Sequence, residues 1–394
     1  MKIIADANIP FVQQCFSSLG EVEVLPAGKI TPSSVRNADV LLVRSVTAVN
    51  SELLSASRVR FVGTATIGFE HVDVEYLRKS NIAFASAPGS NANSVAEYVV
   101  AALLSVGNKL QIELEGKSIG IIGVGNCGSR VAQKCTALGM KVFLNDPPLQ
   151  RQTNDPKYLP IERLFECDFI TLHTPLTFEG VDRTFHLADA DFFKSLRTGC
   201  VFINTSRGGV VETAALKNVI RSGRLKAVVL DVWENEPNID TELLQMVDIG
   251  TPHIAGYSLD GKVVGMIMIY RAACEHFGLE PQFDAASFLP APAVSEIRVD
   301  LDTGGEQNIY GEPVEPIIHQ TVQQVYAINR DDFNTREILM IPAGQQGRFF
   351  DDLRKNYPVR REFQNTRVVL APAPAEKKLA KKLKGIGFQV SKVG

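Results

Sequence analysis

Three polar side chains of complementary chemistry, Arg207, Glu236 and His253, each follow a short apolar run in the middle of the chain. A neutral imidazole can accept the proton of an alcohol near neutral pH. A carboxylate beside it orients the ring and stabilises the imidazolium that forms, and a guanidinium binds a carboxylate through two parallel hydrogen bonds. Taken singly, the histidine could be a structural or exposed residue, the glutamate a turn residue and the arginine a surface charge. Together, and with a cofactor to take the hydride, they fit the oxidation of a 2-hydroxy acid.

A glycine-rich turn precedes these residues in the chain. Ser118–Ile122 predicts a strand and is followed by Gly123, Gly125 and Gly128 in the spacing GxGxxG, after which a helical pattern runs to Leu138. In this context the first glycine permits a tight turn, the second lets the backbone approach a pyrophosphate, and the third packs the helix against the strand. The anion would bind the amide N–H groups at the start of the helix. The turn therefore predicts a dinucleotide site.

An acidic residue follows the next predicted strand, Lys141–Asn145. Asp146 lies about 20 residues beyond the glycine turn, where dinucleotide-binding folds place a carboxylate on the ribose hydroxyls. It would repel a 2′-phosphate, and two prolines rather than an arginine come next. The sequence therefore favours NAD, although Arg151 lies close enough along the chain to keep NADP as an alternative.

Apolar runs that could form buried strands alternate with helical patterns as far as residue 284. The first series of predicted strands is Lys2–Ala5, Val40–Val43, Val59–Gly63 and Ile82–Ala85, and the second is Ser118–Ile122, Lys141–Asn145, Phe169–Leu172, Val201–Asn204, Ala227–Leu230 and Asp248–Gly250. The predicted helices are Ser94–Leu110, Asn126–Leu138, Ala188–Leu196, Glu212–Ser222 and Ser258–Phe277. Such alternation predicts parallel sheets covered on both sides. Because the carboxyl ends of parallel strands form one edge, the three polar residues should meet there.

The character of the sequence changes at a proline-rich segment, residues 288–292. Beyond it we expect helices at Val314–Ile328, Gln346–Asn356 and Lys377–Lys384, and strands at Ile338–Met340, Thr366–Leu370 and Phe388–Val390. These elements predict an α+β module.

Composition excludes several classes of protein. The 394 residues carry a net charge of −3, with 41 basic and 44 acidic side chains, so no global basic excess suggests a nucleic acid or a membrane surface as partner. The lysine-rich C-terminal segment fits a solvated amphipathic helix. No signal peptide, membrane span or metal-ligand cluster is evident. The 6 cysteines are scattered, which favours reduced thiols and a cytoplasmic protein.

Five segments together resemble the D-isomer-specific 2-hydroxyacid dehydrogenase family: GVGNCG, HTPLT, INTSRGG, LDVWENEP and TPHIAG. The resemblance implies a doubly wound parallel-sheet (Rossmann) NAD domain, residues 94–258, inserted in a flavodoxin-like α/β substrate-binding domain, residues 1–93 and 259–284. Residues 285–394 would form the C-terminal α+β domain.

The family resemblance also implies roles for individual residues. Arg207 would bind the substrate, Glu236 would support the histidine, and His253 would accept the proton. The expected cofactor-binding residues are Gly123, Gly125, Asn126, Cys127, Gly128, Asp146, Thr174, Thr205, Ser206, Arg207, Asp231 and Gly256. Arg44, Ser45, Thr66 and Tyr257 are the expected substrate-binding residues. At the start of a helix, Cys127 could have a lowered pKa.

The C-terminal third, in segments 338–346 and 350–363, resembles one subfamily whose substrate is a phosphorylated hydroxy acid and whose C-terminal domain forms a homodimer. Two alternatives remain open. One is another family enzyme, such as phosphoglycerate dehydrogenase with a regulatory C-terminal module. The other is a non-catalytic, NAD-sensing protein of the corepressor type.

Overall fold

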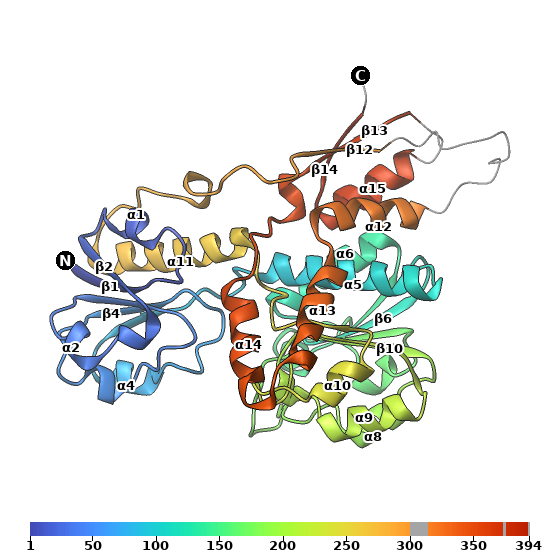
Figure 1. Ribbon diagram of the computed structural model, residues 1–394, viewed down its shortest axis with the longest axis horizontal. Coiled ribbons are helices and arrows are strands. Elements are labelled where there is room, and N and C mark those ends of the chain that lie inside the picture. The colour runs from blue at the N-terminus through green and yellow to red at the C-terminus, as the bar shows by residue number, and fades with distance from the viewer. Residues whose placement is uncertain (300–313, 373–375, 393–394) are drawn as a thin grey trace. The chain divides into compact units, whose positions relative to one another are not determined.

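The computed structural model describes residues 1–299, 314–372 and 376–392. The chain divides into two compact units: residues 1–91 with 258–290, and residues 92–257 with 291–394 (Figure 1). The C-terminal segment therefore clusters with the predicted NAD-binding segment. The division into three domains stays a prediction.

The first unit contains a five-stranded parallel sheet in the order β2-β1-β3-β4-β5. Its strands are β1 (Lys2–Asp6), β2 (Glu21–Leu25), β3 (Val40–Val43), β4 (Phe61–Thr64) and β5 (Ala83–Ala85). Its helices are α1 (Val12–Phe16), α2 (Pro32–Val35), α3 (Ser51–Leu54), α4 (Val74–Lys79) and α11 (Leu259–Phe277), with short 3₁₀ turns η1 (Ala27–Lys29) and η4 (Ala285–Ser287).

Strand β2 was not expected, so the prediction of four strands in this unit is wrong. Its sequence alternates Glu21 and Glu23 with Val22 and Val24, and it pairs only with β1 at the edge of the sheet. An edge strand can expose charged side chains. A search for runs that are apolar on both faces therefore passes over it.

The second unit contains a six-stranded parallel sheet in the order β11-β10-β9-β8-β6-β7. The strands are β6 (Ser118–Ile122), β7 (Lys141–Asn145), β8 (Phe169–Leu172), β9 (Cys200–Asn204), β10 (Leu225–Leu230) and β11 (Ile249–Gly250). Helices α5 (Ala92–Leu110), α6 (Asn126–Leu138), α7 (Pro147–Thr153), α8 (Ala190–Ser195), α9 (Thr213–Arg221) and α10 (Thr241–Met246) accompany it, with 3₁₀ turns η2 (Ile161–Leu164) and η3 (Gly208–Val210). The doubly wound fold is confirmed. Its strand order reverses at β6, so the ligand crevice is expected at the carboxyl ends of β6 and β8.

The C-terminal segment adds a three-stranded parallel sheet in the order β12-β13-β14. These strands are β12 (Glu296–Val299), β13 (Arg367–Leu370) and β14 (Gln389–Lys392). The helices are α12 (Val314–Val325), α13 (Ile328–Arg336), α14 (Ala343–Lys355) and α15 (Glu376–Ile386), with 3₁₀ turns η5 (Glu337–Met340) and η6 (Phe363–Asn365). The predicted strand at Ile338–Met340 is wrong because this segment is turn η5, where Ile338 is buried and Met340 is 88% exposed. Strand β12 was missed.

Helix α5 is buried over almost its whole length. It packs against α6 on one side and against α12 and α13 of the C-terminal segment (Figure 1). A helix that is apolar all round needs such cover on every face.

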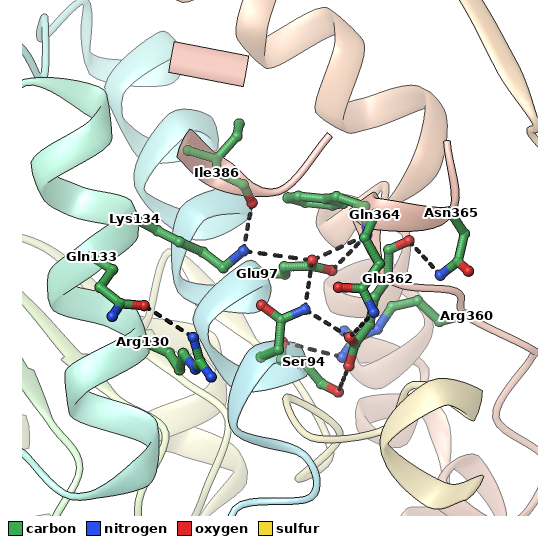
Figure 2. Close-up of polar contacts among 12 residues, drawn as sticks. Ser94, Glu97, Arg130, Gln133, Lys134, Arg360, Glu362, Gln364, Asn365 and Ile386 are labelled. Atoms are coloured by element: carbon green, nitrogen blue, oxygen red, sulfur yellow. Dashed lines mark hydrogen bonds and ion pairs between the residues drawn. The ribbon is translucent and has the colours of Figure 1, made fainter. Parts of the chain in front are cut away.

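The charged residue Glu97 lies within this buried helix (Figure 2). Its carboxylate accepts hydrogen bonds from the Phe363 N–H at 3.0 and 3.1 Å and lies 3.7 Å from the Lys134 Nζ. Lys134 also donates to the Ile386 carbonyl at 2.5 Å. Burial raises the pKa of Glu97 and lowers that of Lys134, and each charge opposes the shift of the other. The pair joins α5, α6 and the C-terminal segment.

Replacement of Lys134 should reveal how far this buried pair holds the second unit together. Lys134→Met leaves the Glu97 carboxylate without its cation, and we expect a loss of about 3 kcal/mol in unfolding free energy. The double variant Lys134→Met/Glu97→Gln should recover part of this loss because no unpaired charge remains. Urea unfolding measures both changes, with Lys381→Met, at an exposed lysine of α15, as a control that leaves the midpoint unchanged. An unchanged midpoint for Lys134→Met would contradict this role.

Candidate active site

The glycine turn between β6 and α6 has little room for side chains. Gly123 has φ +87°, and a Cβ there would lie 2.7 Å from the His173 carbonyl carbon. At Gly128 a Cβ would lie 2.0 Å from the Gly123 oxygen, which requires the helix to pass very close to the turn. At Gly125, by contrast, a Cβ meets nothing within 4 Å. The turn thus has two packed glycines and one open glycine beside the start of α6.

The first residues of α6 differ in accessibility. Asn126 is exposed, whereas Cys127 is half-buried. A lowered pKa at Cys127, which its position at the start of a helix allowed, is not found. Burial raises the pKa of this thiol to about 11, although the charge of Arg207 opposes the shift. Cys127 is therefore a neutral thiol at physiological pH.

Asp146 stands at the carboxyl end of β7, next to the glycine turn. Its carboxylate accepts hydrogen bonds from the Val124 N–H at 2.7 Å and the Leu149 N–H at 3.0 Å, and it caps α7. It thus fixes the turn as well as offering a negative charge near the expected ribose. Arg151, the residue for which NADP stayed an alternative cofactor, forms an ion pair with Asp182.

His173 and Thr174 follow β8 on the other side of the turn. Burial lowers the pKa of His173 to about 3, so its ring is neutral. The ring lies 3.0 Å from the Thr171 hydroxyl and 3.3 Å from the Thr205 hydroxyl.

Among the described residues, no hydrogen-bond partner satisfies the buried Thr174 Oγ1. The residue lies against Gly123, where an added Cβ would be 2.8 Å from the Thr174 nitrogen. An open amide turn beside an unsatisfied hydroxyl fits a dinucleotide ligand.

Asn204, at the end of β9, shapes the turn that carries Arg207. Its side-chain oxygen accepts hydrogen bonds from the Ser206 N–H at 3.0 Å and the Ser206 hydroxyl at 2.8 Å. Its Nδ2 donates to the Arg207 carbonyl at 3.1 Å. Sequence reasoning passed over Asn204, although an asparagine two residues before a serine at a strand end is a known turn signal. Arg207 itself is half-buried, and its Nη1 donates to the Ser206 carbonyl at 2.9 Å.

The buried carboxylate of Asp231 organises the loop after β11. Its Oδ1 accepts hydrogen bonds from the Thr251 hydroxyl at 2.7 Å and the Ile254 N–H at 2.8 Å, and its Oδ2 accepts from the Ala255 N–H at 2.9 Å. Its main-chain carbonyl accepts from the His253 N–H at 2.7 Å. Burial raises the pKa of Asp231, and these hydrogen bonds and the charge of His253 oppose that shift. Contact with the nicotinamide stays a prediction.

His253 and Glu236 form a direct pair, with His253 Nδ1 2.7 Å from Glu236 Oε2. The Trp233 N–H donates to the other Glu236 oxygen at 2.8 Å. Burial would raise the pKa of Glu236, but the charge and hydrogen bond of His253 outweigh it, so the carboxylate has a pKa below its ordinary value. An ionised Glu236 holds the proton of the neutral imidazole on Nδ1 and leaves Nε2 as an acceptor.

Arg207, Glu236 and His253 come from the loops that follow β9, β10 and β11, which are neighbours in the sheet. Two of these loops approach closely, since a Cβ at Gly208 would lie 1.9 Å from the Trp233 carbonyl oxygen. The indole of Trp233 donates to the Thr251 carbonyl at 2.9 Å. The predicted trio is therefore gathered at one edge of the second unit.

The predicted substrate-binding residues lie in both units. In the first unit Arg44 and Ser45 follow β3, and Thr66 follows the neighbouring β4. Arg44 donates to the Asn8 carbonyl at 3.0 Å, Ser45 is exposed, and the Thr66 hydroxyl donates to the Gly68 carbonyl at 2.9 Å. In the second unit Gly256 and Tyr257 follow the histidine loop, and both are half-buried.

Within residues 1–299, 314–372 and 376–392, no group of three or more His, Cys, Asp or Glu side chains could hold a metal ion. No helix in those ranges is long and apolar enough to cross a membrane.

Comparison with known proteins shows which family the chain belongs to. Residues 92–255 match the sequence family described as D-isomer specific 2-hydroxyacid dehydrogenase, NAD binding domain, and residues 288–387 match a domain of unknown function. The erythronate-4-phosphate dehydrogenase of Cellvibrio japonicus is 46% identical over 94% of this chain and 95% of its own length. The erythronate-4-phosphate dehydrogenase of Hahella chejuensis is 41% identical over 99% of this chain and 100% of its own length. The chain belongs to the erythronate-4-phosphate dehydrogenase family.

Solved structures extend the likeness to the fold. A D-lactate dehydrogenase from Aquifex aeolicus, complexed with NAD and lactic acid, is 26% identical with a TM-score of 0.58 over 70% of this chain and 96% of that one. The TT0316 protein of Thermus thermophilus has a TM-score of 0.63 over 72% of this chain and 99% of that one, and its sequence is 24% identical. The C-terminal segment is present in the erythronate-4-phosphate dehydrogenase relatives, which match over nearly the whole chain. The NAD-binding domain expected from the sequence is confirmed.

Two glycine substitutions should separate packing from cofactor binding at the turn. Gly128→Ala brings a methyl group onto a carbonyl oxygen and should lower both the unfolding midpoint and the affinity for NADH. Gly125→Ala should lower the midpoint much less, by the small cost of alanine at the N-cap of α6, but weaken NADH binding about 10-fold or more, the cost of a steric clash with the bound group. Thermal unfolding and fluorescence titration with NADH measure the two effects. Unchanged NADH binding by Gly125→Ala would mean that the pyrophosphate binds elsewhere.

Proposed function

We propose that this chain oxidises 4-phospho-D-erythronate to 2-oxo-3-hydroxy-4-phosphobutanoate with reduction of NAD, as a step in pyridoxal 5′-phosphate (vitamin B6) biosynthesis. The hydrogen bond of 2.7 Å between His253 and Glu236 at the edge of the NAD-binding sheet carries the chemistry. The substrate assignment rests on family membership, since relatives named for this activity match nearly the whole chain.

His253 is the proton acceptor in this proposal. Its Nδ1 is held by Glu236, so Nε2 takes the proton of the substrate hydroxyl as the C–H bond of the same carbon breaks. The imidazolium that forms lies beside an ionised carboxylate, which stabilises it. The pKa of Glu236 is held below its ordinary value, so this carboxylate stays charged through the cycle.

Arg207 binds the substrate carboxylate in a bidentate fashion and polarises the oxygen that becomes the carbonyl. NAD, when bound, accepts the hydride from the substrate. Its proposed protein contacts are the glycine turn with Asn126 and Cys127, Asp146 for the ribose, and Thr174, Thr205, Ser206, Asp231 and Gly256 around it. The open Gly125 and the unsatisfied Thr174 hydroxyl support this placement.

The remaining recognition falls to Arg44, Ser45, Thr66 and Tyr257, whose polar groups can donate hydrogen bonds to the substrate's anionic groups. A phosphate and a carboxylate on one small molecule require a locally positive site within a protein whose net charge is −3. We also infer a cytoplasmic homodimer that associates through the C-terminal domain and has no nucleic acid partner.

An NADH-formation assay tests the substrate assignment directly. 4-Phosphoerythronate should be oxidised with a higher kcat/KM than 3-phosphoglycerate or D-lactate. A parallel assay with a 2-oxo acid as possible acceptor, followed as 2-oxo acid consumed, covers an enzyme that keeps its NADH bound. Preference for 3-phosphoglycerate would favour the alternative family enzyme. NADH binding without turnover of any substrate would favour the sensing protein.

The role of His253 can be tested against a matched histidine. His253→Ala should bind NADH like the parent and lose about 100-fold or more in kcat, the scale of a general base. His186 forms a similar pair, 2.7 Å from Glu234, and is similarly exposed at 29% against 31%. His186→Ala should therefore change kcat by no more than about 3-fold. Equal kcat losses in the two variants would remove the assignment of His253.

A further inference from the structure

Helix α14 of the C-terminal segment places an arginine beside the proposed active site. The guanidinium carbon of Arg354 lies 5.9 Å from the centre of the Tyr257 ring. Tyr257 follows the loop that carries His253, and its ring packs edge-to-face on Tyr357 at 6.0 Å. All four residues belong to the second unit. The match of residues 288–387 to a domain of unknown function assigns no role to this helix.

Arg354 hydrogen-bonds to the Tyr257 side chain, and part of its remaining hydrogen-bonding capacity is unused. Its side chain is 24% exposed, and within the described part of the chain its buried Nε has no hydrogen-bond partner. The carboxylate that pairs with it, Asp351, is 3.6 Å from Nη1 and is 59% exposed. A contact of that length at the surface contributes little. A half-buried guanidinium with an unused donor is expected to have a ligand or a water beside it.

Arg354 keeps its positive charge although it is largely buried. Although burial opposes it, the phenol of Tyr257 and the carboxylate of Glu236 raise the pKa of Arg354, so it is a permanent cation. Glu236 already pairs with His253 at 2.7 Å and with the Trp233 N–H. Arg354 therefore adds to the stabilisation of the Glu236 charge but is not its main partner.

We propose that Arg354 is a substrate-binding residue that donates hydrogen bonds to the phosphate of the phosphorylated hydroxy acid. Arg207 is assigned to the carboxylate of that substrate, so the phosphate is the anion that remains for a second arginine in this unit. A planar guanidinium suits a phosphate because its N–H groups match two oxygens at once. The inference rests on the proposed function and adds to the contacts proposed for Arg44. It gives the C-terminal domain a part in substrate selection.

The test compares 4-phosphoerythronate with erythronate, which lacks the phosphate. Arg354→Gln should raise the KM for 4-phosphoerythronate about 10- to 100-fold, the value of one charged hydrogen-bonding partner. It should change kcat/KM for erythronate by less than about 3-fold, and Arg354→Lys should recover part of the loss. Arg348→Gln is the matched control, because Arg348 lies on the same helix and is 89% exposed. This control should behave like the parent with both substrates.

Inorganic phosphate provides a second readout, as a competitive inhibitor whose inhibition should weaken in Arg354→Gln by a similar factor. Equal losses with both substrates would overturn the proposal, since Arg354 would then act through Glu236 on the chemistry. Unchanged kinetics would also overturn it. If the parent oxidises 4-phosphoerythronate, and Arg354→Gln shows either equal losses with both substrates or unchanged kinetics, only this inference fails. If the parent does not oxidise that substrate, the proposed function fails and the phosphate assignment fails with it.

Discussion

The buried carboxylate of Asp231 is the interaction on which the site depends. It gathers a hydroxyl and two main-chain N–H groups of the loop after β11, while its own carbonyl accepts from the His253 N–H. A charged acceptor forms stronger hydrogen bonds than a neutral one, and here it fixes a loop in which His253 adopts φ +59°. In this loop the imidazole of His253 contacts Glu236, which follows Asp231 after β10. The two loops thus bring His253 and Glu236 together.

The C-terminal segment supports the same loop from its other side. Arg360 donates to the Ala255 carbonyl at 2.6 Å, and Asp332 accepts from the Gly250 N–H at 2.7 Å. Arg360 is followed closely by Glu362, which accepts from the Ser94 hydroxyl at 2.7 Å near the buried Glu97 (Figure 2). Charged groups at this depth are costly unless they are paired. The geometry of the loop is therefore tied to a segment that lies far from it in sequence.

Local patterns in the sequence predict most of this architecture. Strands β6, β7 and β8 are apolar on both faces and agree with their predicted bounds, and the trio was found because its members follow strands. Strands β2 and β12 were missed because half of each faces solvent and carries charge. The raised pKa of Cys127 comes from burial, which the position of the residue at the start of a helix does not reveal. Asn204 was not singled out because its part in the site is to shape the turn before Arg207 and not to do chemistry itself.

The central claim is that this site removes a hydride from the carbon bearing the 2-hydroxyl of a phosphorylated acid. The most direct measurement uses 4-phosphoerythronate deuterated at that carbon, with NAD and the full chain, and determines by mass spectrometry where the deuterium goes. The account predicts one deuterium in the reduced nicotinamide and a slower hydride-transfer step in single-turnover experiments. NADH that carries no deuterium, or the absence of any NADH with this substrate, would contradict it.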